Sequence, residues 1–125
     1  MKFLCLAYYD VAKFNALSKD ELEALVSKCP AYDAELRKSG HLLLSASLGE
    51  PQDTINIRPK NCKPTYTDGP FTETKELIGG FFMIEAADAD EAKRIASHHP
   101  AAHLGETVGW GIEVRPIGFY LDTQR

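Results

Sequence analysis

The segment over residues 3–9 is apolar on both faces of a predicted strand. Because successive side chains of a strand point to opposite sides, Phe3, Cys5, Ala7 and Tyr9 share one face, and Leu4, Leu6 and Tyr8 share the other. Residues 81–86 repeat this pattern. We therefore expect two central strands, each covered on both sides.

The longer of two helical segments begins at Ser18. Ser18 and Glu21 have the spacing of a capping box, and apolar residues then recur at helical spacing to about Lys38. Gly40 is expected to end this helix. Because Pro30 inside the segment removes one backbone donor, we expect a kink or a short break there.

The second helical segment is shorter. Asp88 and Glu91 repeat the capping-box spacing, apolar residues follow at helical intervals, and Pro100 blocks continuation. Residues 41–47 and 112–115 are predicted strands. Two further short strands, at 54–58 and 63–67, flank a turn-forming cluster at 59–62 and are predicted to pair as a hairpin.

The resulting order is strand, helix, strand, inserted hairpin, strand, helix, strand. This order is typical of the α+β class and predicts a ferredoxin-like split βαβ fold with an antiparallel sheet and an inserted β-hairpin. Residues 10–17, 72–76 and 101–111 are predicted connections. Both helices would then lie on one face of the sheet.

The other face would be bare although it is apolar. If it holds about ten apolar side chains of about 40 Å² each, exposing it to water costs on the order of 10 kcal/mol at ~25 cal/mol per Å². That cost is comparable with the net stability of a domain. We therefore expect a homodimer in which two sheets pack face to face about a two-fold axis and close a dimeric α/β barrel around a cavity.

Composition narrows the class of protein. A chain of 125 residues suits one domain, so residues 1–125 are predicted to form a single domain, with 117–125 as a C-terminal tail. The net charge of −4 without a Lys or Arg run gives no reason to expect nucleic acid as a partner. No apolar run approaches the roughly 18 residues of a membrane-spanning helix, so no membrane partner is expected.

The three cysteines indicate a reducing compartment. Cys5, Cys29 and Cys62 are odd in number and lack C-x-x-C spacing, so neither a disulfide framework nor a zinc ribbon is predicted. The opening apolar run of about seven residues is at the lower limit of a signal-peptide core, and Asp10 follows it without a small-residue cleavage site, so we interpret it as a strand. These features predict a cytoplasmic location.

One motif closely resembles the DGPF branch of the YCII-related family. It runs Thr67-Asp-Gly-Pro-Phe-Thr-Glu-Thr-Lys-Glu-Leu-Ile-Gly-Gly-Phe81, and Glu113-Val-Arg-Pro116 follows near the end. The resemblance covers nearly the whole chain and implies the dimeric α/β-barrel superfamily. Its members include muconolactone isomerases, monooxygenases and haem-handling enzymes, so the resemblance does not imply one reaction.

The resemblance also bears on partners and on the site. Some DGPF-type proteins are encoded with, or fused to, extracytoplasmic-function sigma factors, which implies a regulatory association. In the YCII branch proper a helix-1 histidine is proposed to pair with an aspartate as an active-site dyad. Cys29 stands at about that position in this chain, so the dyad is not carried over.

Asp68 and His99 are the candidate catalytic residues. Asp68 precedes Gly69-Pro70, a pair that fixes the direction of a turn, so its carboxylate is placed to act as a general base; the alternative is that it caps the turn. His99 titrates near neutral pH and suits acid/base chemistry. Gly69, Pro70, Tyr9, Phe81 and Arg115 are the candidate ligand-binding residues.

We predict neither a metal nor another cofactor. His99 and His103 stand four residues apart, but Pro100 interrupts the helix that would place them on one face. The leading hypothesis is a homodimer that binds a small organic molecule in the barrel cleft, with cofactor-free acid/base activity of the isomerase or lyase type. The alternative is a non-catalytic interaction or regulatory module associated with a sigma factor.

Overall fold

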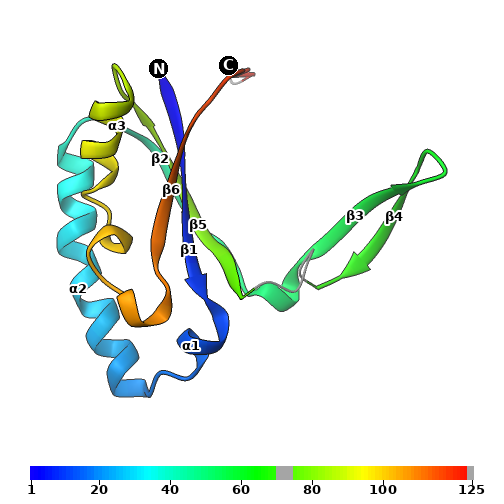
Figure 1. Cartoon of the computed structure of the whole chain (residues 1–125), viewed down its shortest axis with the longest axis horizontal. Helices are drawn as coiled ribbons and strands as arrows, with labels where there is room; N and C mark the ends of the chain where they lie inside the picture. The colour runs from blue at the N-terminus through cyan, green and yellow to red at the C-terminus, as the bar shows by residue number, and fades with distance from the viewer. Residues whose placement is uncertain (70–74, 124–125) are drawn as a thin grey trace.

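The computed structural model describes residues 1–69 and 75–123 and has an α+β fold (Figure 1). Its strands and helices, in chain order, are β1 (Lys2–Asp10), α1 (Val11–Asn15), α2 (Lys19–Lys38), β2 (Leu42–Ser47), β3 (Ile55–Lys60), β4 (Lys63–Asp68), β5 (Glu76–Glu85), α3 (Ala89–Ala96) and β6 (Gly111–Pro116). Three 3₁₀ turns are η1 (Pro51–Asp53), η2 (Pro100–Ala102) and η3 (Glu106–Val108).

Four strands form one antiparallel sheet in the order β2-β5-β1-β6. Strands β1 and β5 are its central pair, as the two-sided apolar pattern predicts. With α2 and α3 on one face, this is the ferredoxin-like arrangement, and the prediction of the fold class is confirmed (Figure 1). Strand β5 begins at Glu76, five residues before the strand predicted at 81–86.

Helix α2 begins with the predicted capping box. Ser18 Oγ accepts a hydrogen bond from the Glu21 N–H at 3.1 Å, and Glu21 Oε1 accepts one from the Ser18 N–H at 2.9 Å. Gly40 follows the helix with φ +77°. The helix runs through Pro30 without the short break that we considered, since its span is continuous from Lys19 to Lys38.

Helix α1 is absent from the sequence-based prediction, which treated residues 10–17 as a connection. It has only five residues and no buried side chain, so it lacks a hydrophobic repeat that could reveal it. Asp10 caps it by accepting a hydrogen bond from the Lys13 N–H at 3.1 Å. Asp10 is only 2% exposed, so this cap lies inside the fold.

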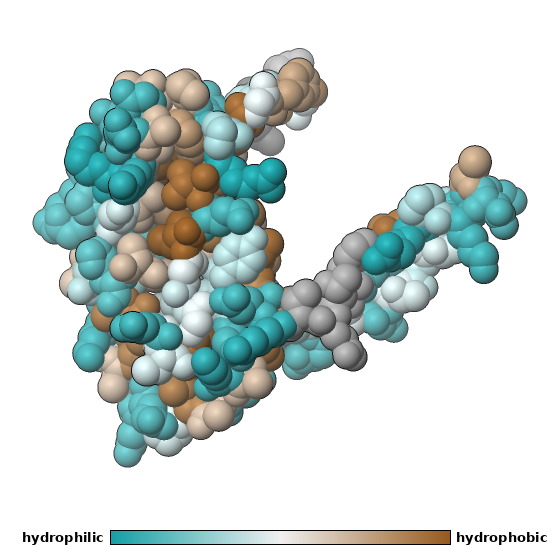
Figure 2. Space-filling model, viewed as in Figure 1, coloured by the Kyte–Doolittle hydropathy of each residue, from teal (hydrophilic) through white to brown (hydrophobic). Residues whose placement is uncertain are grey.

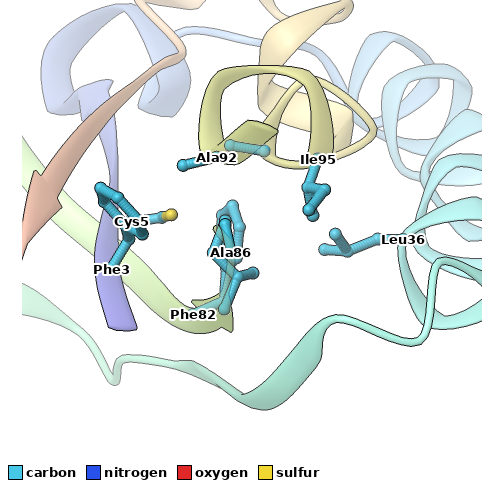
Figure 3. Close-up of a cluster of buried hydrophobic side chains, with 9 residues drawn as sticks. Phe3, Cys5, Leu36, Phe82, Ala86, Ala92 and Ile95 are labelled. Carbon is cyan, nitrogen blue, oxygen red and sulfur yellow. The ribbon is translucent and has the colours of Figure 1, made fainter. Parts of the chain in front are cut away.

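The core lies between the sheet and the helices α2 and α3. Phe82 and Ile84 of β5 are completely buried, and Cys5 of β1 packs beside them. Leu36 of α2 and Ile95 of α3 close the cluster from the helix side (Figure 3). This core holds the helices in register on the sheet and so fixes the position of their cavity-lining side chains.

The opposite face of the sheet is apolar and carries no helix among the described elements (Figure 1). On it Leu6 pairs with Phe81 and Leu4 pairs with Met83. Leu44, opposite Met83 on β2, is 42% exposed. The bare apolar face expected from the sequence is therefore present.

The inserted hairpin forms an arm, defined here as β3 and β4 with their turn. Its register runs from Ile55 opposite Asp68 to Lys60 opposite Lys63. Asn61 and Cys62 form the turn with positive φ angles of 53° and 63°. The arm projects from the body on the side opposite the helices (Figures 1 and 2). The predicted pairing is confirmed.

Candidate functional site

A cavity of about 710 Å³ lies between α2 and the end of the sheet at which β1 finishes and the arm leaves the body. Residues of α1, α2, η2 and of three strands line it, as does the connection between β2 and β3. The volume falls within the range of about 300–1,000 Å³ that is usual for small-molecule sites. Four side chains carry its chemistry: Tyr9, Cys29, Asp33 and His99.

His99 is held in a fixed orientation. Its Nδ1 accepts a hydrogen bond from the Ala101 N–H at 3.0 Å and so caps η2. Its ring stacks on Phe82, with centroids 4.7 Å apart and planes 3° apart. Burial lowers the pKa of His99, and the opposing effect of the Asp33 charge is smaller. The imidazole is therefore neutral at pH 7.

Helix α2 presents Cys29, Asp33 and Arg37 to the cavity. Their spacing of four residues places them on one face of the helix. The Cys29 thiol donates to the Leu25 carbonyl at 3.6 Å, and burial, followed by the Asp33 charge, raises its pKa. Cys29 is thus a protonated thiol at pH 7, which is a poor nucleophile.

Tyr9 enters the cavity from the end of β1, where its ring meets Phe14 edge-on with centroids 5.5 Å apart. A Cβ at Gly79 would lie 3.0 Å from the Tyr9 ring, and one at Gly80 would lie 2.8 Å from the Ala46 carbonyl oxygen. The Gly79-Gly80 pair therefore makes room for this ring and for the β2 backbone. Desolvation, followed by the Glu50 charge, raises the pKa of Tyr9, so the hydroxyl keeps its proton.

Three of the residues selected from the sequence border this cavity: Tyr9, Phe81 and His99. The side chain of Phe81, however, lies on the bare face opposite Leu6, because the next residue, Phe82, points into the core. Asp68 is exposed at the end of β4, opposite Ile55, and Gly69 donates to the Thr54 carbonyl at 2.8 Å. Neither is among the described residues that line the cavity. Their roles stay predictions.

The other two predicted ligand-binding residues are Arg115 and Pro70. Arg115 is exposed on β6 opposite Leu4, on the bare face of the sheet. Pro70 lies outside the described residues. Among the described residues, no group of three or more His, Cys, Asp or Glu side chains is arranged to hold a metal ion. His103 instead stacks on Tyr32, with centroids 4.9 Å apart.

Asp33, Cys29 and Arg37 are cavity residues that the sequence analysis did not select. Their spacing of four residues shows that they share one face of the helix. A helix face with charged residues is equally typical of a surface exposed to solvent, so the spacing alone did not identify a site. The sequence also does not show that this face of α2 packs against η2.

A second cavity of about 600 Å³ lies at the base of the arm, between Tyr8, Leu48 and Ile78.

None of the helices in the described ranges is long and apolar enough to span a bilayer.

The model of the YCII-related domain matches residues 1–116 of this chain. An uncharacterized protein of Rhizobium meliloti (strain 1021) is 31% identical over 120 residues, which cover 96% of this chain and 94% of that protein.

A solved structure offers a weaker likeness. It is the 5-chloro-2-hydroxyhydroquinone dehydrochlorinase of Burkholderia phenoliruptrix AC1100, in complex with 2,5-dihydroxybenzoquinone, with a TM-score of 0.47 and 15% sequence identity. The match covers 94% of this chain and 93% of that one. The match to the family model over residues 1–116, together with the relative that is 31% identical, identifies this chain as a member of the YCII-related family.

Proposed function

We propose that this protein binds a small organic molecule in the 710 Å³ cavity and performs cofactor-free acid/base chemistry on it, of the isomerase or lyase type. The observation that carries the proposal is the neutral, fixed imidazole of His99 in the wall of a cavity that also contains the Asp33 carboxylate. A pair of titratable groups in one pocket is the usual basis of proton transfer at neutral pH.

Tyr9 is the proposed ligand-binding residue, because it lines the same cavity as His99. Phe81 borders this cavity, but its side chain lies on the bare face of the sheet opposite Leu6, so its role stays a prediction. Asp68, Gly69, Pro70 and Arg115 remain predicted contributors. Asp68 is the predicted general base, and its carboxylate lies on the arm. Of the two predicted catalytic residues, His99 lines the cavity, whereas Asp68 is not among the described residues that do.

The proposed assembly is a cytoplasmic homodimer of single-domain chains, joined through the bare face of the sheet. Leu4, Leu6, Phe81 and Met83 on that face supply the apolar surface that a second copy would cover. Face-to-face packing of two such sheets spaces them about 10 Å apart, so each bare face would cover the other.

Thermal unfolding in the presence of a metabolite library tests ligand binding. A compound at about 100 times its Kd adds about 2.7 kcal/mol to the free energy of unfolding. Ser45→Trp, which places an indole in the cavity wall, should abolish the shift. Ala34→Trp, on an exposed part of α2 outside the cavity lining, should retain it. A shift that survives Ser45→Trp would place the ligand elsewhere.

The alternative function, an interaction module for an extracytoplasmic-function sigma factor, is favoured by the exposed apolar side chains of the arm. Ile55, Ile57 and Tyr66 are 67%, 60% and 66% exposed. Asp68→Asn and His99→Asn together separate the two functions: loss of turnover with the fold intact in either variant favours the enzyme, whereas an interaction module would be unaffected by both. Ile57→Asp should weaken co-purification of such a factor if the arm is the contact.

A further inference from the structure

The hydrogen bonding of His99 determines which proton it can move. Nδ1 accepts from the Ala101 N–H at 3.0 Å, so it carries no proton of its own. In a neutral imidazole the proton must then lie on Nε2. A ring in this state donates a hydrogen bond from Nε2 and has no free lone pair with which to act as a base.

The base must therefore be another group in the cavity wall. Among the described lining residues, the carboxylates are Asp33 and Glu50. Glu50 is exposed in the connection that follows β2, whereas Asp33 is partly buried on α2. Asp33 is also the carboxylate whose charge acts on His99. The thiol of Cys29 and the hydroxyl of Tyr9 keep their protons at pH 7 and are excluded as resting bases.

We propose that Asp33 is the general base of this site, that His99 is a neutral hydrogen-bond donor to the substrate oxygen, and that the substrate is a small cyclic carbonyl compound with an acidic neighbouring C–H bond. This division of roles rests on the proposed function and adds the substrate class. Tyr9 and Trp110 line the same cavity, and aromatic side chains of this kind suit a flat ring.

The proton transfer is balanced without a cofactor. The Asp33 carboxylate removes a proton from the carbon next to the carbonyl, and the C–H electron pair forms a carbon–carbon double bond. The carbonyl π pair moves to oxygen, where the Nε2–H of His99 stabilises the developing negative charge. In a substrate with a β,γ double bond the intermediate is a dienolate, and Asp33 returns the same proton to the γ-carbon. The oxygen pair re-forms the carbonyl, the enolate π pair becomes the α,β double bond, and the former β,γ π pair forms the new C–H bond, which gives the conjugated isomer.

Nitrogen-15 NMR of the His99 ring tests the donor role without any substrate. The inference predicts the neutral tautomer with hydrogen on Nε2 at pH 7. His99→Asn is the companion variant, because its side-chain oxygen can still accept from the Ala101 N–H while the Nε2 donor is lost. A ring protonated on Nδ1, or on both nitrogens, at pH 7 would overturn the inference.

Isomerisation of cyclohex-3-en-1-one to cyclohex-2-en-1-one, followed by the absorbance of the conjugated product, tests the base. Asp33→Asn should lower kcat/KM by about 10²–10⁴-fold, and His99→Asn by about 10²–10³-fold. Glu23→Gln, at an exposed position of the same helix outside the cavity lining, should leave it unchanged.

The outcomes separate this inference from the proposed function. A rate in Asp33→Asn within twofold of the wild type would contradict the assignment of the base. No conversion by the wild type, while library compounds still bind in the cavity, would overturn the substrate class and leave ligand binding intact. Only the absence of both conversion and cavity binding would remove the proposed function as well.

Discussion

The imidazole of His99 lies parallel to the phenyl ring of Phe82, with planes 3° apart and centroids separated by 4.7 Å. Phe82 is completely buried in the core between the sheet and the helices. The candidate catalytic side chain is therefore supported directly by the core. Changes in the core beneath this ring should affect the site as well as the fold.

Phe82→Ala should destabilise the protein by about 3–5 kcal/mol, because it removes a buried ring and leaves a cavity. Val26→Ala, at a position of α2 that is 53% exposed, should change stability by no more than about 0.5 kcal/mol. Urea unfolding followed by circular dichroism measures both values. Equal changes in the free energy of unfolding for the two variants would show that the Phe82 ring contributes no more to stability than an exposed side chain does.

Stability should depend on pH through His99. Burial lowers the pKa of His99 below its usual 6.5, so the unfolded chain binds more protons than the folded chain below about that pH. The contribution of the neutral ring is present above pH 6.5 and is lost as the pH falls through the folded-state pKa. The difference in unfolding free energy between wild type and His99→Asn should therefore change between pH 7.5 and 5.

Urea titrations of the two proteins at matched pH values measure this difference. Effects of the other titratable groups cancel to first order, because both proteins retain them. A difference that stays constant from pH 7.5 to 5 would mean that His99 titrates alike in the folded and unfolded chains.

The proposed dimer predicts a change of mass on mutation of the bare face. The wild type should sediment at twice the 13.8 kDa of one chain. Leu6→Glu buries a charge in the proposed contact between sheets and should give monomers. Val26→Glu, on the exposed side of α2, should remain dimeric. A wild type that sediments as a single chain at micromolar concentration would exclude the dimer.

The three thiols should differ in reactivity. Burial raises the pKa of Cys5 to about 12, and the side chain is fully buried, so it should react with Ellman's reagent only on unfolding. Cys62 is exposed in the turn of the arm and should react first. Cys62→Ser should remove the fast phase; a fast phase that persists in this variant would show that another thiol is accessible.

The hydrophobic pattern was sufficient to predict the sheet, both principal helices and the arm. Two-sided apolar strands such as β1 and β5 must be central, and the pair Ser18 and Glu21 located the start of α2. The early start of β5 was not predictable in the same way, because Gly79 and Gly80 separate Leu77 and Ile78 from the apolar run that begins at Phe81. The hydrophobic pattern does not predict strand residues that are held only by pairing with the neighbouring strand. Glu76, which pairs with Asp10 of β1, is such a residue.

The candidate site was predicted only in part. His99, Tyr9 and Phe81 were selected by residue type and lie around one cavity. Asp33 was not selected, because its role depends on α2 packing against η2, which is a contact between segments far apart in the sequence. The hydrogen bond to Nδ1 that makes His99 a donor is likewise a property of the folded backbone.

The most direct test is a crystal structure of the protein with the tightest-binding compound from the thermal-shift library. Ligand density in the cavity between Tyr9 and His99, with an oxygen atom within hydrogen-bonding distance of His99 Nε2, is the predicted result. Density confined to the arm around Asp68, with the cavity beside His99 unfilled, would contradict it.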